Sequence, residues 1–397
     1  MSGGRAIRLR GCRMHALVVP NISGLSLQIT DACNLACSYC YFREKEPRSL
    51  SAAMVDGALN LLERESGDSP SWGINLFGGE PTLFPERIAS VTAQATDRAA
   101  RLGKTVNFSM TTNGTRFDDA MLALTRRYRI STQLSLDGNE AAHDTYRVHH
   151  NGRGSFQDIV ANLPRLKQAP GFSVRMTISV RMLPHLSASM SDLIDLGIDS
   201  IAASVVAEDD WTEDAYDLFA DEWLKVGALV VSHGLRGRRL RIKDLSADSG
   251  IEAQCKPVRG FGCGAATSFL FVDAKGDLYP CHRYPGYFNK NPDVRLGSVF
   301  TGLDAERRAY YVEANRSTAK KGCASFIHPD RTGGSCSQCG IQSACGGACM
   351  AINHNATGDP TRPPPVLGRI KQIMLAVQER IDTLSELRVS KEIENVR

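Results

Sequence analysis

Residues 25–42 read LSLQITDACNLACSYCYF, a β-rich run that leads directly into three closely spaced cysteines. Cys33, Cys37 and Cys40 form a CxxxCxxC pattern with no fourth cysteine nearby. Zinc usually takes paired CxxC units that give four ligands, whereas three thiolates on one loop can hold three corners of a cubane iron–sulfur cluster. The stretch therefore predicts a strand followed by a cluster-binding loop with one iron left open. A zinc site with a remote fourth ligand is the alternative.

The order of strand and then helix repeats downstream of this loop. Six such units imply a parallel sheet, which we expect to curve into a partial (β/α)6 barrel. Polar or glycine-rich residues follow nearly every strand, at the sheet edge where such folds bind ligands. The expected strands cover residues 25–30, 73–79, 106–114, 131–138, 174–180 and 200–206, and the expected helices lie near residues 52–65, 86–102, 118–127, 155–168 and 187–196.

The composition excludes several classes of protein. Among the 397 residues, 47 Lys and Arg face 43 Asp and Glu, a surplus too small to indicate a nucleic-acid or membrane partner. No apolar run is long enough to span a membrane, and ALVVP near the N-terminus is too short for the core of a signal peptide. We therefore expect a cytoplasmic protein. In such a chain, 12 cysteines are better read as metal or redox ligands than as disulfides.

The cysteines also suggest how the chain is divided. None occurs between Cys40 and Cys255, and a cysteine- and glycine-rich part follows. Apolar residues at helical spacing near the end predict an amphipathic helix that packs on the body. The expected segments are an N-terminal segment (1–24), the partial barrel (25–240), a cysteine-rich domain (241–365) and a C-terminal helix (366–397).

The cysteine loop resembles the hallmark CxxxCxφC of radical S-adenosylmethionine (radical SAM) enzymes, in which φ is the aromatic residue matched here by Tyr39. The resemblance implies that the open iron of a [4Fe-4S] cluster binds the amine and carboxylate of S-adenosylmethionine (SAM). An electron from the cluster then cleaves SAM to a 5'-deoxyadenosyl radical. An external donor of the flavodoxin or ferredoxin type would supply the electron.

Three further motifs follow on successive predicted strands, in the order of this family. GGEP (Gly78, Gly79, Glu80 and Pro81) resembles the segment whose backbone carbonyls and glutamate meet the methionine ammonium. TTNGT (111–115) and SLDG (135–138) end the next two strands, and SLDGNEAAHDTYR resembles a stretch of the peptide-modifying members. By this resemblance, Asn113 and Ser135 are candidates for the ribose hydroxyls and Arg147 for the methionine carboxylate. For each residue taken singly, a capping or turn role is the alternative.

The second group of cysteines resembles the SPASM domain, which carries auxiliary [4Fe-4S] clusters in maturases of peptides and proteins. The resemblance gives the first auxiliary cluster four ligands, Cys255, Cys263, Cys281 and Cys349, and the second cluster three, Cys336, Cys339 and Cys345. The family's last ligand is missing from GDPTRPPPVLG (358–368). Three alternatives stay open for that position: Cys323, which we favour slightly, a residue such as His354 or Asp359, or an open iron. A zinc ribbon is the alternative for Cys336, Cys339, Cys345 and Cys349.

The resemblance implies a maturase that abstracts a hydrogen atom from a ribosomally made peptide and installs a C–C or thioether or ether cross-link. The alternative is an anaerobic sulfatase-maturing enzyme that forms formylglycine. Those relatives usually place an aspartate after the cysteine matched by Cys281, where this chain has His282. His282 is thus a candidate base, with a hydrogen bond to a cluster sulfur as the alternative role. The expected partner is a precursor peptide or protein. Because Cys33 lies so early, we expect recognition to come from a separate leader-binding protein, from the barrel mouth or from a short motif of the substrate.

Overall fold

The structure, a computed structural model, describes residues 20–42, 45–243, 245, 263–288, 292–321 and 349–396. Strands and helices alternate along the first half of the chain, as the sequence predicts. The elements of this alternation are β1 (Gly24–Thr30), α1 (Ala52–Glu65), β2 (Ser71–Gly78), α2 (Pro85–Arg101), β3 (Thr105–Thr112), α3 (Asp119–Arg127), β4 (Ser131–Ser135), α5 (Phe156–Leu166), β5 (Ser173–Ile178), α6 (Leu186–Asp195), β6 (Ser200–Val205) and α7 (Glu213–Leu235).

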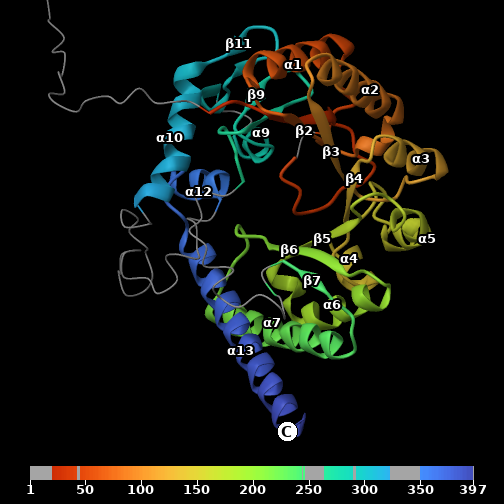
Figure 1. The fold of residues 1–397 in the computed structure, drawn as a ribbon, viewed down its shortest axis with the longest axis vertical. Coiled ribbons are helices and arrows are strands. Elements are labelled where there is room, and N and C mark those ends of the chain that lie inside the picture. Colours follow the sequence, from red (N-terminus) through yellow and green to blue (C-terminus); the bar gives the residue numbers. More distant parts are fainter. Residues whose placement is uncertain are drawn as a thin grey trace, which may run out of the picture.

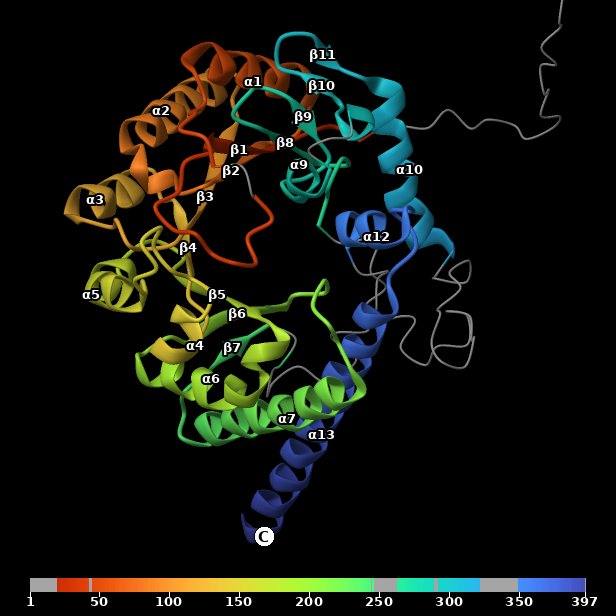
Figure 2. The same cartoon turned by 180° about the vertical axis from the view of Figure 1, so that it is seen from behind.

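Strands β1 to β6 form a parallel sheet in sequence order. The sheet curves, and helices α1, α2, α3, α5, α6 and α7 lie on its outer side (Figures 1 and 2). The loop that follows β1, drawn in red, runs on the concave side. The expected partial (β/α)6 barrel is therefore confirmed, and the cysteine loop lies inside its curve.

The burial of β5 shows why these segments form strands with one fixed register. Val174, Met176 and Ile178 are fully buried, and Arg175 and Thr177 alternate with them. Since successive side chains of a strand point to opposite faces, the apolar residues pack under the helices and the polar ones face the concave side. Each buried aliphatic side chain contributes about 1.5–3 kcal/mol, so a slip by one residue would be costly.

The helices begin where the sequence offers a capping side chain. Ser51 accepts a hydrogen bond from the backbone N–H of Met54 (3.2 Å) at the start of α1. Asp118 accepts one from Met121 (2.8 Å) at the start of α3. Such side chains satisfy N–H groups that have no partner within the helix, and each contributes roughly 1 kcal/mol.

The C-terminal part of the chain extends the same sheet on both edges. Strand β7 (Arg241–Ile242) pairs parallel with β6. Strand β8 (Phe269–Val272) pairs parallel with β1, and β9 (Leu278–Tyr279) returns antiparallel beside it. The sheet thus has nine strands in the order β7-β6-β5-β4-β3-β2-β1-β8-β9.

Most of the remaining elements are helices. A long terminal helix, α13, crosses α7 and packs against it (Figure 2). Arg369 of α13 donates two hydrogen bonds to Glu213, and Ile370, Met374, Val377 and Ile381 are buried. In the described residues, no helix is both long and apolar enough to cross a bilayer. The bounds are α9 (Arg283–Tyr287), α10 (Ala305–Lys321), α12 (Met350–Thr357) and α13 (Pro365–Val396).

Candidate active site at the mouth of the barrel

The loop that carries Cys33, Cys37 and Cys40 is held by backbone hydrogen bonds to the segment that follows β4. Ala36 N–H donates to the Val148 carbonyl (2.7 Å), and Ser38 N–H donates to the Tyr146 carbonyl (3.1 Å). His150 contacts the Cys33 carbonyl through Nε2 (2.9 Å). These contacts to the backbone of the cysteine loop hold it at the mouth of the barrel.

A buried network beneath the loop joins the aromatic residue of the cysteine motif to the SLDG segment. The Tyr39 hydroxyl donates to Asp137 Oδ2. Arg147 binds the same carboxylate through Nε (2.7 Å) and Nη2 (3.1 Å), and its guanidinium lies 5.2 Å from the centre of the Tyr39 ring. Thr177 N–H donates to Asp137 Oδ1 (2.8 Å). Burial alone would raise the pKa of Asp137, but Arg147 outweighs it and holds that pKa below its usual value.

The GGEP segment brings β2 against the base of the loop. Gly79 N–H donates to the Thr30 carbonyl, and Glu80 N–H donates to the Ala32 carbonyl (both 2.8 Å). Gly78 has φ +131°, and a Cβ at Gly79 would lie 2.6 Å from the Ala32 carbonyl carbon. Only glycine permits such an approach of two backbones. Pro81 then begins a short 3-10 helix, η1 (Pro81–Leu83).

The Glu80 carboxylate is buried and bonded within the protein. Oε1 accepts hydrogen bonds from the N–H and the hydroxyl of Thr82 (3.1 and 2.7 Å) and from the Thr112 hydroxyl (2.7 Å). Oε2 accepts one from Asn113 N–H (2.6 Å). Burial raises the pKa of Glu80, and these bonds offset part of the rise. A carboxylate oxygen with one donor keeps a lone pair for another, such as an ammonium group.

Asn113 and Ser135 differ in how many hydrogen bonds their side chains already make within the protein. The Asn113 amide donates to Asn34 Oδ1 (2.9 Å), approaches Cys33 Sγ (3.9 Å) and accepts from Thr115. The Ser135 hydroxyl has no hydrogen-bond partner in the described part of the chain. Its place on the concave face leaves it available to a ligand.

The donor set of the cysteine loop fits an iron–sulfur cluster. Leu35 N–H donates to Cys33 Sγ (3.4 Å), and N–H groups aimed at sulfur stabilise a metal-bound thiolate. Burial, with the Glu80 charge as a second cause, raises the pKa of Cys33 to about 12. The free Cys33 thiol is thus protonated, and binding of iron would release its proton.

Across residues 20–42, 45–243, 245, 263–288, 292–321 and 349–396, no three His, Cys, Asp or Glu side chains are grouped as ligands of one metal ion. A single zinc ion would need four ligands arranged around it. A cubane has the different requirement of one thiolate at each of several irons.

Three cysteines of the second group lie in the described part. Cys281 follows β9, and Cys349 precedes α12. Burial, followed by the charges of Cys349 and Cys263, raises the pKa of Cys281 to about 12, so these three thiols lie within electrostatic reach of one another. Cys255, Cys323, Cys336, Cys339 and Cys345 lie outside the described residues. The His354 ring packs against Phe288 (centroids 4.8 Å apart), and Asp359 Oδ1 accepts hydrogen bonds from Thr361.

His282 lies in an aromatic wall between the cysteine loop and the β2 end. Its ring centroid is 4.7 Å from that of Phe77, 6.0 Å from Tyr41 and 6.5 Å from Phe271. Among the described residues, its ring nitrogens have no hydrogen-bond partner. Burial, followed by the charges of Arg283 and Arg175, lowers the pKa of His282 to about 3, so the ring is neutral.

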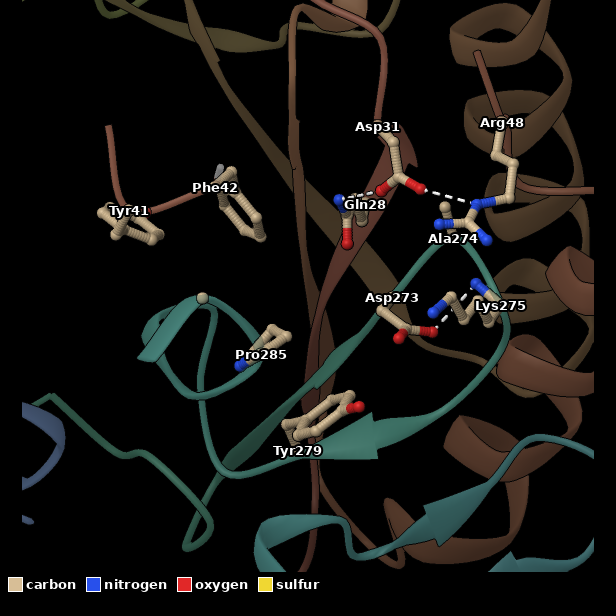
Figure 3. A pocket seen from close by; sticks show the side chains of 11 residues that line it. Gln28, Asp31, Tyr41, Phe42, Arg48, Asp273, Ala274, Lys275, Tyr279 and Pro285 are labelled. Atoms are coloured by element: carbon tan, nitrogen blue, oxygen red, sulfur yellow. Dashed lines mark hydrogen bonds and ion pairs between the residues drawn. The ribbon is translucent and has the colours of Figure 1, made fainter. Parts of the chain in front are cut away.

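A polar cavity of about 80 Å³ lies beside the wall, between the ends of β1 and β8 (Figure 3). Asp31 accepts a hydrogen bond from Gln28 and forms an ion pair with Arg48 (2.9 Å). Across the cavity, Asp273 accepts from the N–H groups of Lys275 (2.9 Å) and Asp277 (2.8 Å). The second acid therefore closes the β8–β9 turn.

Asp273 should make the stability of the fold depend on pH. Its burial raises the pKa from 3.8 to about 6. A carboxyl whose folded pKa is raised stabilises the fold most below the unfolded pKa and loses that contribution as pH rises through 6. The shift corresponds to about 3 kcal/mol. We expect Asp273→Asn, which keeps an acceptor for the two N–H groups, to be more stable than wild type at pH 8 and to lose this advantage near pH 4.

Urea unfolding of both proteins at pH 4, 6 and 8 would measure this difference. Asp68→Asn removes an exposed carboxylate and serves as the matched control. An equal gain at all three pH values would contradict the assignment to Asp273.

The comparison with protein families identifies the domain that carries this site. A family model described as the Radical SAM superfamily matches residues 27–196. These residues form a radical SAM domain. The protein is therefore an enzyme, and the cofactors of its radical SAM domain are a [4Fe-4S] cluster and SAM.

The chain that carries this radical SAM domain also has relatives that match most of its length. It is 27% identical over 347 residues to a serine-type anaerobic sulfatase-maturating enzyme of Klebsiella aerogenes, covering 83% of this chain and 80% of that protein. It is 27% identical over 351 residues to mycofactocin maturase MftC of Mycobacterium tuberculosis, covering 86% and 81%. Native anSMEcpe with bound AdoMet and Cp18Cys peptide superposes with a TM-score of 0.70 at 15% identity, covering 91% and 98%, which shows a shared fold.

Several residues of the site did not stand out in the sequence. Tyr39 and Asp137 lie inside recognised motifs, but their hydrogen bond joins positions far apart in the chain. His150 touches the loop through a backbone carbonyl, which leaves no pattern in the sequence. Arg175 did leave a signal, because it is the one charged residue in the segment VRMTISV.

Proposed function

We propose that this protein is a radical SAM maturase of a peptide or protein substrate, and that Cys33, Cys37 and Cys40 hold its SAM-binding cluster. The supporting observation is the convergence of three strand ends on the cysteine loop. The β2 end bonds to Ala32, the β3 end bonds to Asn34, and the β4 end bonds to Tyr39. A loop fixed at so many points can present three thiolates without further ordering.

The residues around the loop would bind SAM by their remaining hydrogen-bonding capacity. Backbone carbonyls of Gly78, Gly79 and Pro81 and the free lone pair of Glu80 would accept from the methionine ammonium. The open hydroxyl of Ser135 would meet the ribose, and Asn113 stays a predicted ribose contact. Arg147 binds Asp137 and Thr177 through Nε and Nη2, which leaves Nη1 for the methionine carboxylate. When bound, the cluster and SAM supply a 5'-deoxyadenosyl radical that takes a hydrogen atom from the substrate.

We assign the second group of cysteines to auxiliary clusters of a SPASM domain. Cys255, Cys263, Cys281 and Cys349 would hold the first cluster. Cys336, Cys339 and Cys345 would hold the second, with Cys323 as the favoured fourth ligand. The first set is supported by Cys349, which contributes to the raised pKa of both Cys263 and Cys281, so that the three thiols lie near one another.

Cross-linking of a ribosomally made peptide is the reaction that we favour. It is supported by His282 in place of the aspartate that formylglycine-forming relatives carry after this cysteine. The similarity to a sulfatase-maturating enzyme favours formylglycine formation as the second candidate. Both candidates require a peptide substrate and an external electron donor, and a separate leader-binding protein is part of the cross-linking proposal.

Anaerobic reconstitution with iron, sulfide, SAM and dithionite tests the proposal. We expect 5'-deoxyadenosine, measured by liquid chromatography, and its absence would contradict the radical SAM maturase. A candidate precursor peptide should then lose two hydrogens without gaining an aldehyde. A sulfatase-derived peptide that instead gains a hydrazine-reactive aldehyde would identify the second candidate.

A further inference from the structure

Arg175 is a cation on the concave face of the barrel without a bonded anion. It lies on β5 between the buried Val174 and Met176, which pack on the other face. Among the described residues, its guanidinium has no hydrogen bond or ion pair. Arg175 is half-buried, and a charge that is partly removed from water without a partner is costly, so a site that retains such a charge is suited to an anionic ligand.

The other two arginines nearby already have partners. Arg147 holds Asp137 through two nitrogens. Arg283 donates to the Tyr287 hydroxyl, which in turn donates to Glu208 Oε1 (2.5 Å). Both repel Arg175, whose pKa is lowered by burial first and then by Arg283, yet a guanidinium stays protonated near neutral pH. An added anion would relieve this repulsion.

The aromatic wall of Tyr41, Phe77 and His282 lies within electrostatic reach of Arg175. Arg175 is one of the charges that lower the His282 pKa, and Tyr41 is one of those that act on Arg175. The rings of Phe77 and Tyr41 lie 4.7 and 6.0 Å from that of His282, so the wall offers a face made of rings. A ligand that fills this space would carry a carboxylate on one side and an aromatic or apolar group on the other.

Arg175 also has a defined place relative to the predicted SAM site. It is the register partner of Ser135 across the β4–β5 pair. Partnered residues of parallel strands point to the same face. An anion bound to Arg175 would therefore lie next to the ribose that Ser135 is proposed to bind.

We propose that Arg175 binds a carboxylate of the peptide substrate and, with the wall of Tyr41, Phe77 and His282, selects an acidic group close to an aromatic residue. This inference rests on the proposed function and deepens it by naming the substrate class. The carboxylate is an Asp or Glu side chain or the C-terminus of the peptide. The methionine carboxylate of SAM is the competing ligand, and the test separates the two.

The test uses reconstituted holoenzyme and acetylated, amidated pentapeptides. Each peptide carries one phenylalanine and, at one of three spacings from it, either glutamate or glutamine. A charged hydrogen bond contributes about 1.5–3 kcal/mol, which corresponds to roughly 10- to 100-fold in Kd. We expect wild type to bind the best glutamate peptide tighter than its glutamine match by such a factor. Arg175→Gln should abolish the preference, and Arg175→Lys should keep part of it.

Two further arms complete the design. Glutamine peptides with a free C-terminus, compared with their amides, show whether the terminal carboxylate is the group bound. In Arg175→Gln, SAM affinity and 5'-deoxyadenosine formation without peptide should stay within about twofold of wild type, because the proposed role of Arg175 includes no contact with SAM. Arg101→Gln, at the exposed end of α2, is the matched control, and iron content verifies that each variant is loaded.

Loss of SAM binding in Arg175→Gln would overturn the inference, because Arg175 would then serve the cofactor. A glutamate preference that persists in Arg175→Gln, or is absent from wild type at both kinds of carboxylate, would overturn it as well. Failure of the proposed function itself would be seen separately, as wild type that forms no 5'-deoxyadenosine.

Discussion

Replacement of Cys33, Cys37 and Cys40 together by alanine is expected to abolish reductive SAM cleavage. The three thiols are the only side chains that we assign to the SAM-binding cluster. Without thiolates the cluster has no protein ligand, so 5'-deoxyadenosine formation should fall to the uncatalysed background, a loss of at least about 10³-fold. Reconstituted wild type and variant should differ by about four irons per chain.

Iron analysis and chromatography of 5'-deoxyadenosine, both done anaerobically, would measure the two effects. Cys12→Ala is the matched control, because Cys12 is assigned to no cluster, and it should keep both iron and activity. If the triple variant kept its full iron content, or still cleaved SAM, the assignment of the cluster to this loop would be wrong.

The second large effect is expected from Gly79→Ala. The added Cβ would lie 2.6 Å from both the carbonyl carbon of Ala32 and the carbonyl oxygen of Asp31, and neither is the flexible end of a side chain. The β2 end and the cysteine loop must then separate, which costs on the order of 1–3 kcal/mol and breaks the hydrogen bond from Glu80 to Ala32. We expect the rate of SAM cleavage to fall about 100-fold, because misplacement by about 1 Å has effects of that size.

Gly73→Ala is the control on the same strand. A Cβ at Gly73 would meet no atom within 4 Å, and its backbone has no positive φ. This variant should cleave SAM at the wild-type rate and bind as much iron. Equal rates in Gly79→Ala and Gly73→Ala would show that close contact between β2 and the loop is unimportant.

The strands were predictable because the alternation of buried and less buried residues is visible within each short segment of sequence. VRMTISV was expected to form a strand over 174–180, and β5 spans Ser173–Ile178. The largest overestimate was at β4, which ends at Ser135 although the expectation ran to residue 138. The physical reason is Asp137, whose side chain takes the Thr177 N–H that a longer β4 would have bonded through its backbone.

The site was predictable only where its residues share a motif. The three cysteines and GGEP are contiguous patterns, and the structure brings them together at the barrel mouth. The bond between Tyr39 and Asp137 and the open position of Arg175 depend on how strands pair, which no local pattern carries. The pairing of β8 with β1 was also missed, because FLFV is a short run with no signal for its partner.

The pairing of β8 with β1 has a consequence for how the protein is made. Until residues 269–272 leave the ribosome, the strand that leads into the cysteine loop has an unpaired edge on one side. Exposed strand edges favour pairing with other chains, and contacts between distant parts of a sequence form slowly. A chain shortened before β8 would therefore be prone to aggregate. The cysteine-rich domain thus protects the edge of β1 through β8, in addition to supplying thiols.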